Sequence, residues 1–352
     1  MGDESTARRK DSHLDLCATA EVEPVENHSL FECVRLVHCA MPELALADVD
    51  LHSTLFGKKL SLPLVVTGMT GGTERSGLVN RDLAALAERH HLAFGVGSQR
   101  AMAERPETAA SYQVRDVAPT AVVIGNVGLR LAASSGVDSV RRLMEAIGAD
   151  GMALHLNAAQ ELTQPEGDRD FRGGYRTVER LAAALGDRLL VKETGCGISG
   201  EVARRLADAG ARVLDVSGLG GTSWVRVEQL RAEGAEAQVG AEFSSWGIPT
   251  AAALASARKA VGPSVKLVAS GGLRTGLEVA KALALGADLV GMALPFFRAQ
   301  QSGGLPGAEQ ALAVVSTALR QALLLTGSRT VADLRARPVV VTGELKDWLA
   351  AV

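Results

Sequence analysis

The chain has 352 residues, 47% of them hydrophobic, so it is long enough to bury a substantial core. Its 37 basic and 40 acidic residues leave a net charge of −3, which gives no electrostatic reason to expect nucleic acid or a membrane surface as partner. Aromatic residues make up only 3% of the chain, which argues against a stacking platform for single-stranded nucleic acid. An anionic ligand would need a local cluster of cations.

The cysteines lack C-x-x-C spacing and are too sparse for a disulfide scaffold; they are Cys17, Cys33, Cys39 and Cys196. The polar first residues show no apolar run of the kind found in secretory leaders. No stretch reaches the roughly 18 consecutive apolar residues of a membrane span. We therefore expect reduced thiols and a cytoplasmic protein. Cys196 could serve as a nucleophile, but no neighbouring base is visible, so a packing thiol is the better interpretation.

From Leu62 onward, short apolar runs alternate with amphipathic helical patterns. The eight runs begin at Leu62, Leu92, Thr120, Gly151, Arg188, Ala211, Val265 and Asp288. Such uniformly apolar runs suit strands buried on both faces, as in a parallel sheet. The helical patterns cover residues 80–91, 137–149, 175–186, 199–210, 248–261 and 276–287. Eight β-α units predict an α/β fold, a closed (β/α)₈ TIM barrel over residues 61–352.

An open, doubly wound sheet is the alternative fold. It would place G-x-G-x-x-G after the first strand, where this chain has MTGGTERSG. Residues 1–60 form an N-terminal extension that could cover a barrel end or reach the site. Long loops are expected after strands 4 and 6, over residues 157–173 and 218–246. In such barrels the chemistry lies on the face where the strands end, and the polar clusters of this chain follow the apolar runs.

Three of these clusters indicate a cofactor or anion site. Gly271 and Gly272 follow the seventh run and GMALP ends the eighth, where barrels often bind a phosphate, although a Gly-Gly pair alone fits a tight turn equally well. Lys192 ends the fifth run, where a cation can face the electron-rich edge of a flavin; the alternative is a core-edge lysine paired with Glu193. Glu161 is the best candidate ligand for Mg²⁺.

Other charged residues leave more alternatives open. Glu166 and Asp168 lie in the same acidic loop as Glu161, where a solvated position is as good an explanation as a ligand role. Arg9 and Lys10 belong to an RRK run near the terminus, which on composition alone is typical of a solvated charged end.

A set of motifs occurs in one order from Arg9 to Pro295: RKDSH, MTGGT, GSQR, GNVG, HLNAAQELTQPEGD, VKETGCGIS, SGLGGTSW, WGIPT and ASGGLRTGLEVAKALALGA. Together they resemble the type 2, FMN-dependent isopentenyl-diphosphate delta-isomerases. The combination of RKxxH, HLNxxQE and GGTSW is highly specific. SGGLR and VKE alone would indicate only the wider superfamily of FMN-binding barrels.

The resemblance implies FMN, Mg²⁺, reduction by NADPH, a diphosphate substrate and a homo-oligomer, commonly a tetramer or octamer. Implied flavin-binding residues are Met69, Thr70, Gly71, Ser98, Asn126, Lys192, Ser217 and Thr222, with Gly271, Gly272, Arg274, Ala293 and Leu294 at the phosphate end. Implied substrate-binding residues are Arg9, Lys10, His13, Ser98, Gln99, Arg100, His155, Asn157 and Gln160. Glu161 would hold Mg²⁺ against the diphosphate.

The implied reaction is a 1,3-allylic proton shift between isopentenyl and dimethylallyl diphosphate, in isoprenoid biosynthesis. Reduced FMN would act as acid and base, with Lys192 stabilising its reduced anion and Gln160 and Glu228 relaying protons. For Glu228, a place on a helix surface is the alternative. A 2-hydroxy-acid oxidase would need a histidine base after strand six, and an inosine-monophosphate-dehydrogenase-like enzyme a cysteine there; GLGGTSW has neither. A catalytically dead flavin-binding protein is the non-enzyme alternative.

Overall fold

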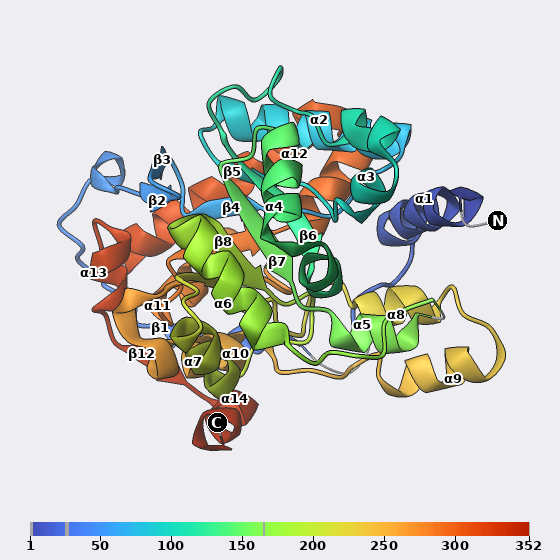
Figure 1. Cartoon of the computed structure of the whole chain (residues 1–352). Coiled ribbons are helices and arrows are strands. Elements are labelled where there is room, and N and C mark those ends of the chain that lie inside the picture. The colour runs from blue at the N-terminus through green and yellow to red at the C-terminus, as the bar shows by residue number, and fades with distance from the viewer. Residues whose placement is uncertain (1–2, 25–27, 165, 352) are drawn as a thin grey trace.

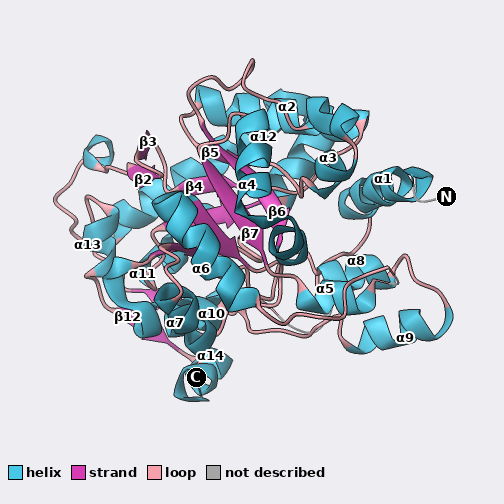
Figure 2. Cartoon of the chain, in the orientation of Figure 1, coloured by secondary structure: helices cyan, strands magenta, loops and turns pink. Residues whose placement is uncertain are grey.

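The computed structural model describes residues 3–24, 28–164 and 166–351, and eight of its strands close into a parallel barrel (Figure 2). The strands are β4 (Leu64–Val66), β5 (Ala93–Gly95), β6 (Val122–Gly128), β7 (Gly151–His155), β8 (Leu189–Lys192), β9 (Val213–Asp215), β10 (Lys266–Ala269) and β11 (Leu289–Met292). Each strand pairs with the next in the chain, and β11 pairs with β4. The TIM-barrel prediction is confirmed, and each predicted run contains one strand.

Helices surround the barrel and follow its strands in sequence (Figure 1). They are α2 (Glu74–Arg89), α3 (Arg100–Glu104), α4 (Leu129–Ala146), α6 (Gly174–Leu185), α7 (Gly200–Asp208), α10 (Thr250–Val261), α11 (Gly276–Ala284) and α12 (Leu294–Leu325). Side chains fix several starts. Thr73 accepts a hydrogen bond from the Ser76 amide to cap α2, and Thr275 and Glu278 form a capping box on α11.

A small hairpin closes the end of the barrel at which the strands begin. Its strands are β2 (Ser53–Leu55) and β3 (Lys58–Leu60), and Leu55 and Leu60 pack on the apolar side chains inside the barrel. A Cβ at Gly151, the first residue of β7, would lie 2.3 Å from the Phe56 ring, so the tip of the hairpin needs glycine there. The Lys58 ammonium lies 2.7 Å from the Asp150 carboxylate at the rim.

The rest of the N-terminal segment lies on other faces. Helix α1 (Asp3–Thr19) packs against α2, α8 and α12, while β1 (Val34–Leu36) pairs with β12 (Val339–Val341), close to the other terminus. Two further helices, α13 (Val331–Arg335) and α14 (Gly343–Ala351), complete the C-terminal part. In the described part of the chain, no helix combines the length and apolar character that crossing a membrane requires.

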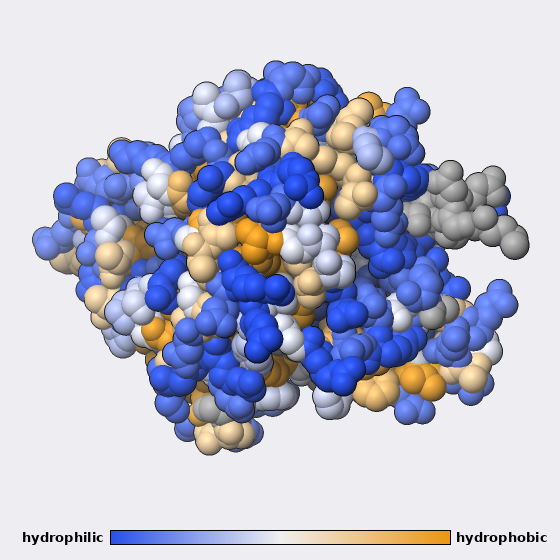
Figure 3. Space-filling view, in the orientation of Figure 1, coloured by the Kyte–Doolittle hydropathy of each residue, from blue (hydrophilic) through white to orange (hydrophobic). Residues whose placement is uncertain are grey.

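The long connections predicted after strands 4 and 6 of the barrel are present, and each contains helical segments. The first contains α5 (Ala158–Thr163), and the second contains α8 (Trp224–Gln229) and α9 (Gly234–Glu242). These three short helices contact one another beside the barrel (Figure 1). In Figure 3, hydrophobic side chains gather at the lower right over α9 and the residues after it, where Val239, Phe243 and Trp246 are exposed.

Candidate active site

One large cavity opens where the barrel strands end, with about 1420 Å³ of empty space including its solvent-open mouth. Strand ends β6, β7 and β8, helices α1, α3 and α5 and the first turn of α4 supply its walls. The predicted site residues that line it are Arg9, Lys10, His13, Met69, Ser98, Arg100, Asn126, His155, Asn157, Gln160, Glu161 and Lys192. The fold therefore brings together residues from six separate motifs.

The floor of the cavity carries a neutral histidine. Asn126 donates its side-chain N–H to the Val96 carbonyl, so its Oδ1 is the atom that faces His155 Nδ1, 2.8 Å away. His155 must then carry its proton on Nδ1 and leave Nε2 as an acceptor. Burial, with the positive charges of Lys192 and Lys10, lowers the pKa of His155 to about 3. His155 is therefore an uncharged group near neutral pH.

Lys192 lies beside this histidine at the end of β8. Its Nζ donates to the Glu193 carbonyl at 2.6 Å, whereas the Glu193 carboxylate accepts the backbone N–H groups of Thr194, Gly195 and Cys196. Burial lowers the pKa of Lys192, although Asp215 opposes the shift. The alternative of an ion pair with the Glu193 side chain is wrong, and the lysine charge faces the cavity.

Helix α1 brings three of its side chains to the mouth. Arg9 Nη1 donates to Glu166 Oε1 at 2.9 Å, and the His13 ring stacks edge-on against Trp224 at 5.2 Å between centroids. Burial, then the charges of Arg9 and Arg100, lowers the pKa of Lys10 to about 8. The RKxxH segment is therefore part of the site and not a solvated charged end.

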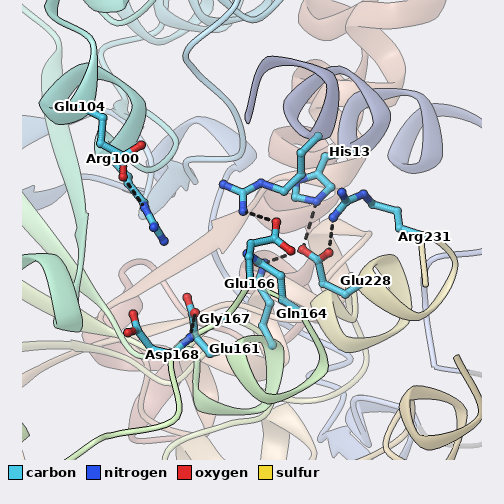
Figure 4. Close-up of polar contacts among 12 residues, drawn as sticks. His13, Arg100, Glu104, Glu161, Gln164, Glu166, Gly167, Asp168, Glu228 and Arg231 are labelled. Atoms are coloured by element: carbon cyan, nitrogen blue, oxygen red, sulfur yellow. Dashed lines mark hydrogen bonds and ion pairs between the residues drawn. The ribbon is translucent and has the colours of Figure 1, made fainter. Parts of the chain in front are cut away.

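Glu228 lies at the end of α8 with its side chain wholly buried, so the alternative of a helix-surface position is wrong. Its Oε1 is 3.1 Å from His13 Nε2 and accepts Gln160 Nε2 at 3.2 Å, and its Oε2 pairs with Arg231 (Figure 4). Burial by itself would raise the pKa of Glu228, but these partners outweigh it and hold the pKa at about 2. Glu228 is therefore a buried carboxylate in contact with a cavity residue.

Glu161 is almost buried and both of its carboxylate oxygens are held. Oε1 accepts Asn157 Nδ2 at 2.8 Å. Oε2 accepts the Asp168 backbone N–H, also at 2.8 Å (Figure 4). No group of three or more His, Cys, Asp or Glu side chains suited to a metal occurs among the described residues. A single oriented carboxylate fits a Mg²⁺ ion that takes its other ligands from substrate phosphates and water.

Among the other predicted residues, Gln99, Thr70 and Gly71 do not line the cavity. The carboxamide of Gln99 donates to the Leu143 carbonyl and accepts the Asn126 backbone N–H, so its polar atoms are used inside the fold. Thr70 is buried against Ser76. A Cβ at Gly71 would lie 2.0 Å from the Tyr112 ring, so this glycine permits close packing.

The residues predicted for the phosphate end of the flavin do not line the cavity. Gly271 and Gly272 adopt φ values of 99° and 89°, which favour glycine, and they lie against the Gly218 and Gly220 carbonyls. Arg274 pairs with Glu23. The N-terminus of α12 has no capping side chain, so its first backbone N–H groups are free of side-chain caps, which a phosphate site requires. The remaining predicted residues of this end, which do not line the cavity, are Ser217, Thr222, Ala293 and Leu294.

The structure also places residues at the site that the sequence did not single out. Glu104 and Arg130 line the cavity, and Asp215 is buried beside Lys192 with its Oδ1 accepting the Ser270 hydroxyl at 2.7 Å. Asp215 ends an apolar run, and that position was the available signal. Cys196 fits a packing thiol, because burial and Glu193 raise its pKa to about 12.

Comparisons with known proteins agree with this geometry. The fold resembles a solved mandelate oxidase with a TM-score of 0.67 at 20% identity, covering 96% of this chain and 99% of the other. A family model described as FMN-dependent dehydrogenase matches residues 133–341. Fold and site thus define an FMN-dependent barrel protein.

Whole-chain relatives narrow this class. An isopentenyl-diphosphate delta-isomerase of Pyrococcus horikoshii is 41% identical over 99% of this chain and 96% of its own length. Another, from Metallosphaera sedula, is 44% identical over 98% and 95%. The chain belongs to the isopentenyl-diphosphate delta-isomerase family, and the resemblance found in its motifs is confirmed.

Proposed function

We propose that the protein interconverts isopentenyl diphosphate and dimethylallyl diphosphate as a type 2, FMN-dependent isomerase. The observation that carries the proposal is the single cavity in which cations from α1 and α3 face the polar ends of β6, β7 and β8. One end of this cavity suits an anionic head group, and its floor suits a planar cofactor. Whole-chain similarity to isomerases of this name supports the same assignment.

The diphosphate is held at the cationic mouth. Arg9, Lys10 and Arg100 supply positive charge, while Ser98, His13, His155 and Asn157 supply hydrogen-bonding groups. Charge-assisted hydrogen bonds of this kind are the strong ones. Mg²⁺ would bind Glu161 together with phosphate oxygens. Binding energy at the mouth then positions the hydrocarbon tail over the floor.

The residues present fit FMN. Met69, Ser98, Asn126 and Lys192 line the cavity and would surround its ring. Outside that lining, Gly271, Gly272 and Arg274 with the uncapped start of α12 would hold its phosphate. When bound and reduced, FMN supplies a group that can add and remove protons next to the alkene. The Lys192 charge would favour the reduced anionic state of the ring.

Gln160 on α5 and Glu228 on α8 provide a route for protons on the side of the cavity that these helices form. The reaction adds a proton to one carbon and removes one from another, so a relay must both give and accept. Gln160 lines the cavity and donates to the buried Glu228, which is ionised near neutral pH. Glu228 thereby orients the Gln160 carboxamide and adds a negative charge that stabilises a cation-like substrate.

We further propose that NADPH reduces the bound flavin and that the protein works as a cytoplasmic homo-oligomer, a tetramer or an octamer. Sedimentation analysis of the purified protein tests the assembly. Stopped-flow reduction of the FMN-loaded protein with NADPH and with NADH tests the reductant.

The deciding experiment is an anaerobic assay with FMN, Mg²⁺, NADPH and isopentenyl diphosphate. We expect dimethylallyl diphosphate to form, and we expect the activity to be lost when 5-deazaFMN, which lacks N5, replaces FMN. Parallel incubation with lactate and mandelate in air tests the 2-hydroxy-acid oxidase alternative. Flavin binding without turnover in either assay would identify a catalytically dead flavin protein and overturn the proposal.

A further inference from the structure

We propose that Arg130 is a further binding residue for the substrate diphosphate, and that Asp168 holds it until the diphosphate arrives. None of the positions matched to the isomerase motifs includes Arg130. It is the second residue of α4, lines the cavity, and keeps 36% of its side chain exposed. The inference rests on the proposed isomerase function and adds a residue to its binding site.

The Arg130 guanidinium does not use all of its hydrogen-bond donors. Its Nε is buried without a hydrogen-bond partner among the described residues, and the nearest carboxylate oxygen, Asp168 Oδ1, lies 3.6 Å away. Stable arginine–carboxylate pairs have N–O distances of about 2.7–2.9 Å. In the same loop, Arg172 makes two such bonds to Asp170, at 2.9 and 2.8 Å. Arg130 therefore has a buried donor available for a better acceptor.

The other two arginines of the mouth are each paired with a carboxylate. Arg9 is paired with Glu166 and Arg100 with Glu104, whose Oε1 accepts Arg100 Nε at 2.8 Å (Figure 4). Asp168 is close enough to Arg100 to raise the pKa of that arginine together with Glu104 and Glu161. Arg130 thus belongs to one ring of arginines around the cavity, each balanced by a carboxylate from the protein itself.

The position of Arg130 at the start of α4 also favours an anion. Gly128 caps α4 with no side-chain hydrogen bond, and Gly128, Arg130, Leu131 and Ser134 all line the cavity. The uncapped N-terminal end of α4 and the Arg130 side chain therefore border the same cavity, and the positive end of a helix dipole favours an anion. A diphosphate carries more negative charge than a carboxylate, so it can replace Asp168 as the partner of Arg130.

A structural role makes a different prediction. If the Arg130–Asp168 pair only anchors residues 157–173 to α4, Arg130→Gln and Asp168→Asn break the same contact and must weaken substrate binding together. If Asp168 competes with the diphosphate, the two substitutions act in opposite directions. Asp168 keeps its backbone hydrogen bond to Glu161 in either variant, so the loop remains attached there.

The test measures binding of inorganic pyrophosphate and isopentenyl diphosphate to FMN-loaded protein by calorimetry, in parallel with KM and kcat. We expect Arg130→Gln to weaken both ligands by at least about tenfold with kcat changed much less. Arg130→Lys should weaken them less, because it keeps the charge. Asp168→Asn should tighten both by about two- to threefold. The matched control is Arg172→Gln, which breaks an exposed pair of the same loop outside the cavity lining.

Opposite changes for Arg130→Gln and Asp168→Asn support the proposal. Parallel weakening, or an Arg130→Gln variant that binds like the wild type, overturns it. Loss of isomerase activity in the wild-type protein is a separate result. If the wild type shows no isomerase activity but binds pyrophosphate, and Arg130→Gln weakens that binding, the anion site stands and the isomerase assignment fails.

Discussion

The two ends of the barrel differ in the polarity of the side chains that cover them. Where the strands begin, Leu55, Phe56 and Leu60 of the β2–β3 hairpin fill the opening with apolar side chains. Where they end, a cavity is lined by cations, amides and carboxylates, and three groups that line it or contact its lining, Lys10, His155 and Glu228, have shifted pKa values. Buried apolar groups stabilise a fold, whereas buried and incompletely paired charges cost stability and are retained where a ligand uses them.

This contrast predicts which measured quantity a substitution will change, according to the end of the barrel at which the residue lies. Substitutions at the hairpin should reduce the free energy of unfolding and leave substrate binding intact. Substitutions at the mouth should change KM or kcat with little effect on unfolding.

The largest effect is expected at the closed end. Leu55→Ala removes a fully buried side chain and should lower the free energy of unfolding by about 2–5 kcal/mol, while the KM for isopentenyl diphosphate stays unchanged. Chemical denaturation followed by circular dichroism measures the loss. The matched control is Leu78→Ala on α2, where the leucine is 62% exposed and the change should stay within about 0.5 kcal/mol.

At the open end, Glu228→Gln should lower kcat by about a hundredfold, because the buried carboxylate that orients Gln160 is lost. Steady-state assays of the FMN-loaded variant measure the change. Glu236→Gln on the exposed surface of α9 serves as control. A Glu228→Gln variant with the wild-type kcat would show that this acid takes no part in the reaction.

The mouth should also give a pH dependence through Lys10. Its pKa of about 8 means that Lys10 is charged below this pH and neutral above it. We therefore expect the KM for isopentenyl diphosphate to rise above pH 8, by at most about tenfold per pH unit. Lys10→Arg stays charged over the same range and should abolish the rise. Identical pH profiles for the two proteins would exclude Lys10 as the titrating group.

The smallest effect is expected for the charge at the rim of the closed end. Lys58 and Asp150 form a partly exposed ion pair at 2.7 Å. Lys58→Met should cost less than about 1 kcal/mol of unfolding free energy, and the cost should shrink at high salt. Denaturation midpoints at low and high salt measure it. A loss as large as that of Leu55→Ala would mean that charge also stabilises this end.

The barrel could be predicted from the sequence because its signal is local. Each strand is a short, uniformly apolar run, and each is followed by a helical pattern. The β2–β3 hairpin escaped prediction because its segment, STLFGKKL, is not a uniformly apolar run, and its stability comes from packing against barrel residues far away in sequence. Helices α5, α8 and α9 were expected as loops for the same reason, since they depend on contacts with one another.

The site was predicted less evenly than the barrel. Residue type and position after a strand indicated Lys192 and Glu161, and both lie at the cavity. Gln99 could not be excluded from sequence, because the direction of its side chain depends on the register of its neighbours. Arg130 was missed because a charged residue in the first turn of a helix is usually solvated.

Helix α1 affects when the binding site becomes complete relative to formation of the barrel. Its cations complete the mouth, yet no strand of the barrel needs it to close. Formation of the barrel and completion of the binding site are thus different steps, and α1 is held by the buried side chains of Leu14 and Cys17 as well as by the His13–Glu228 contact. A diphosphate that bridges α1 and the barrel would add a further link between them, so ligand binding would stabilise the wall of the site that α1 supplies.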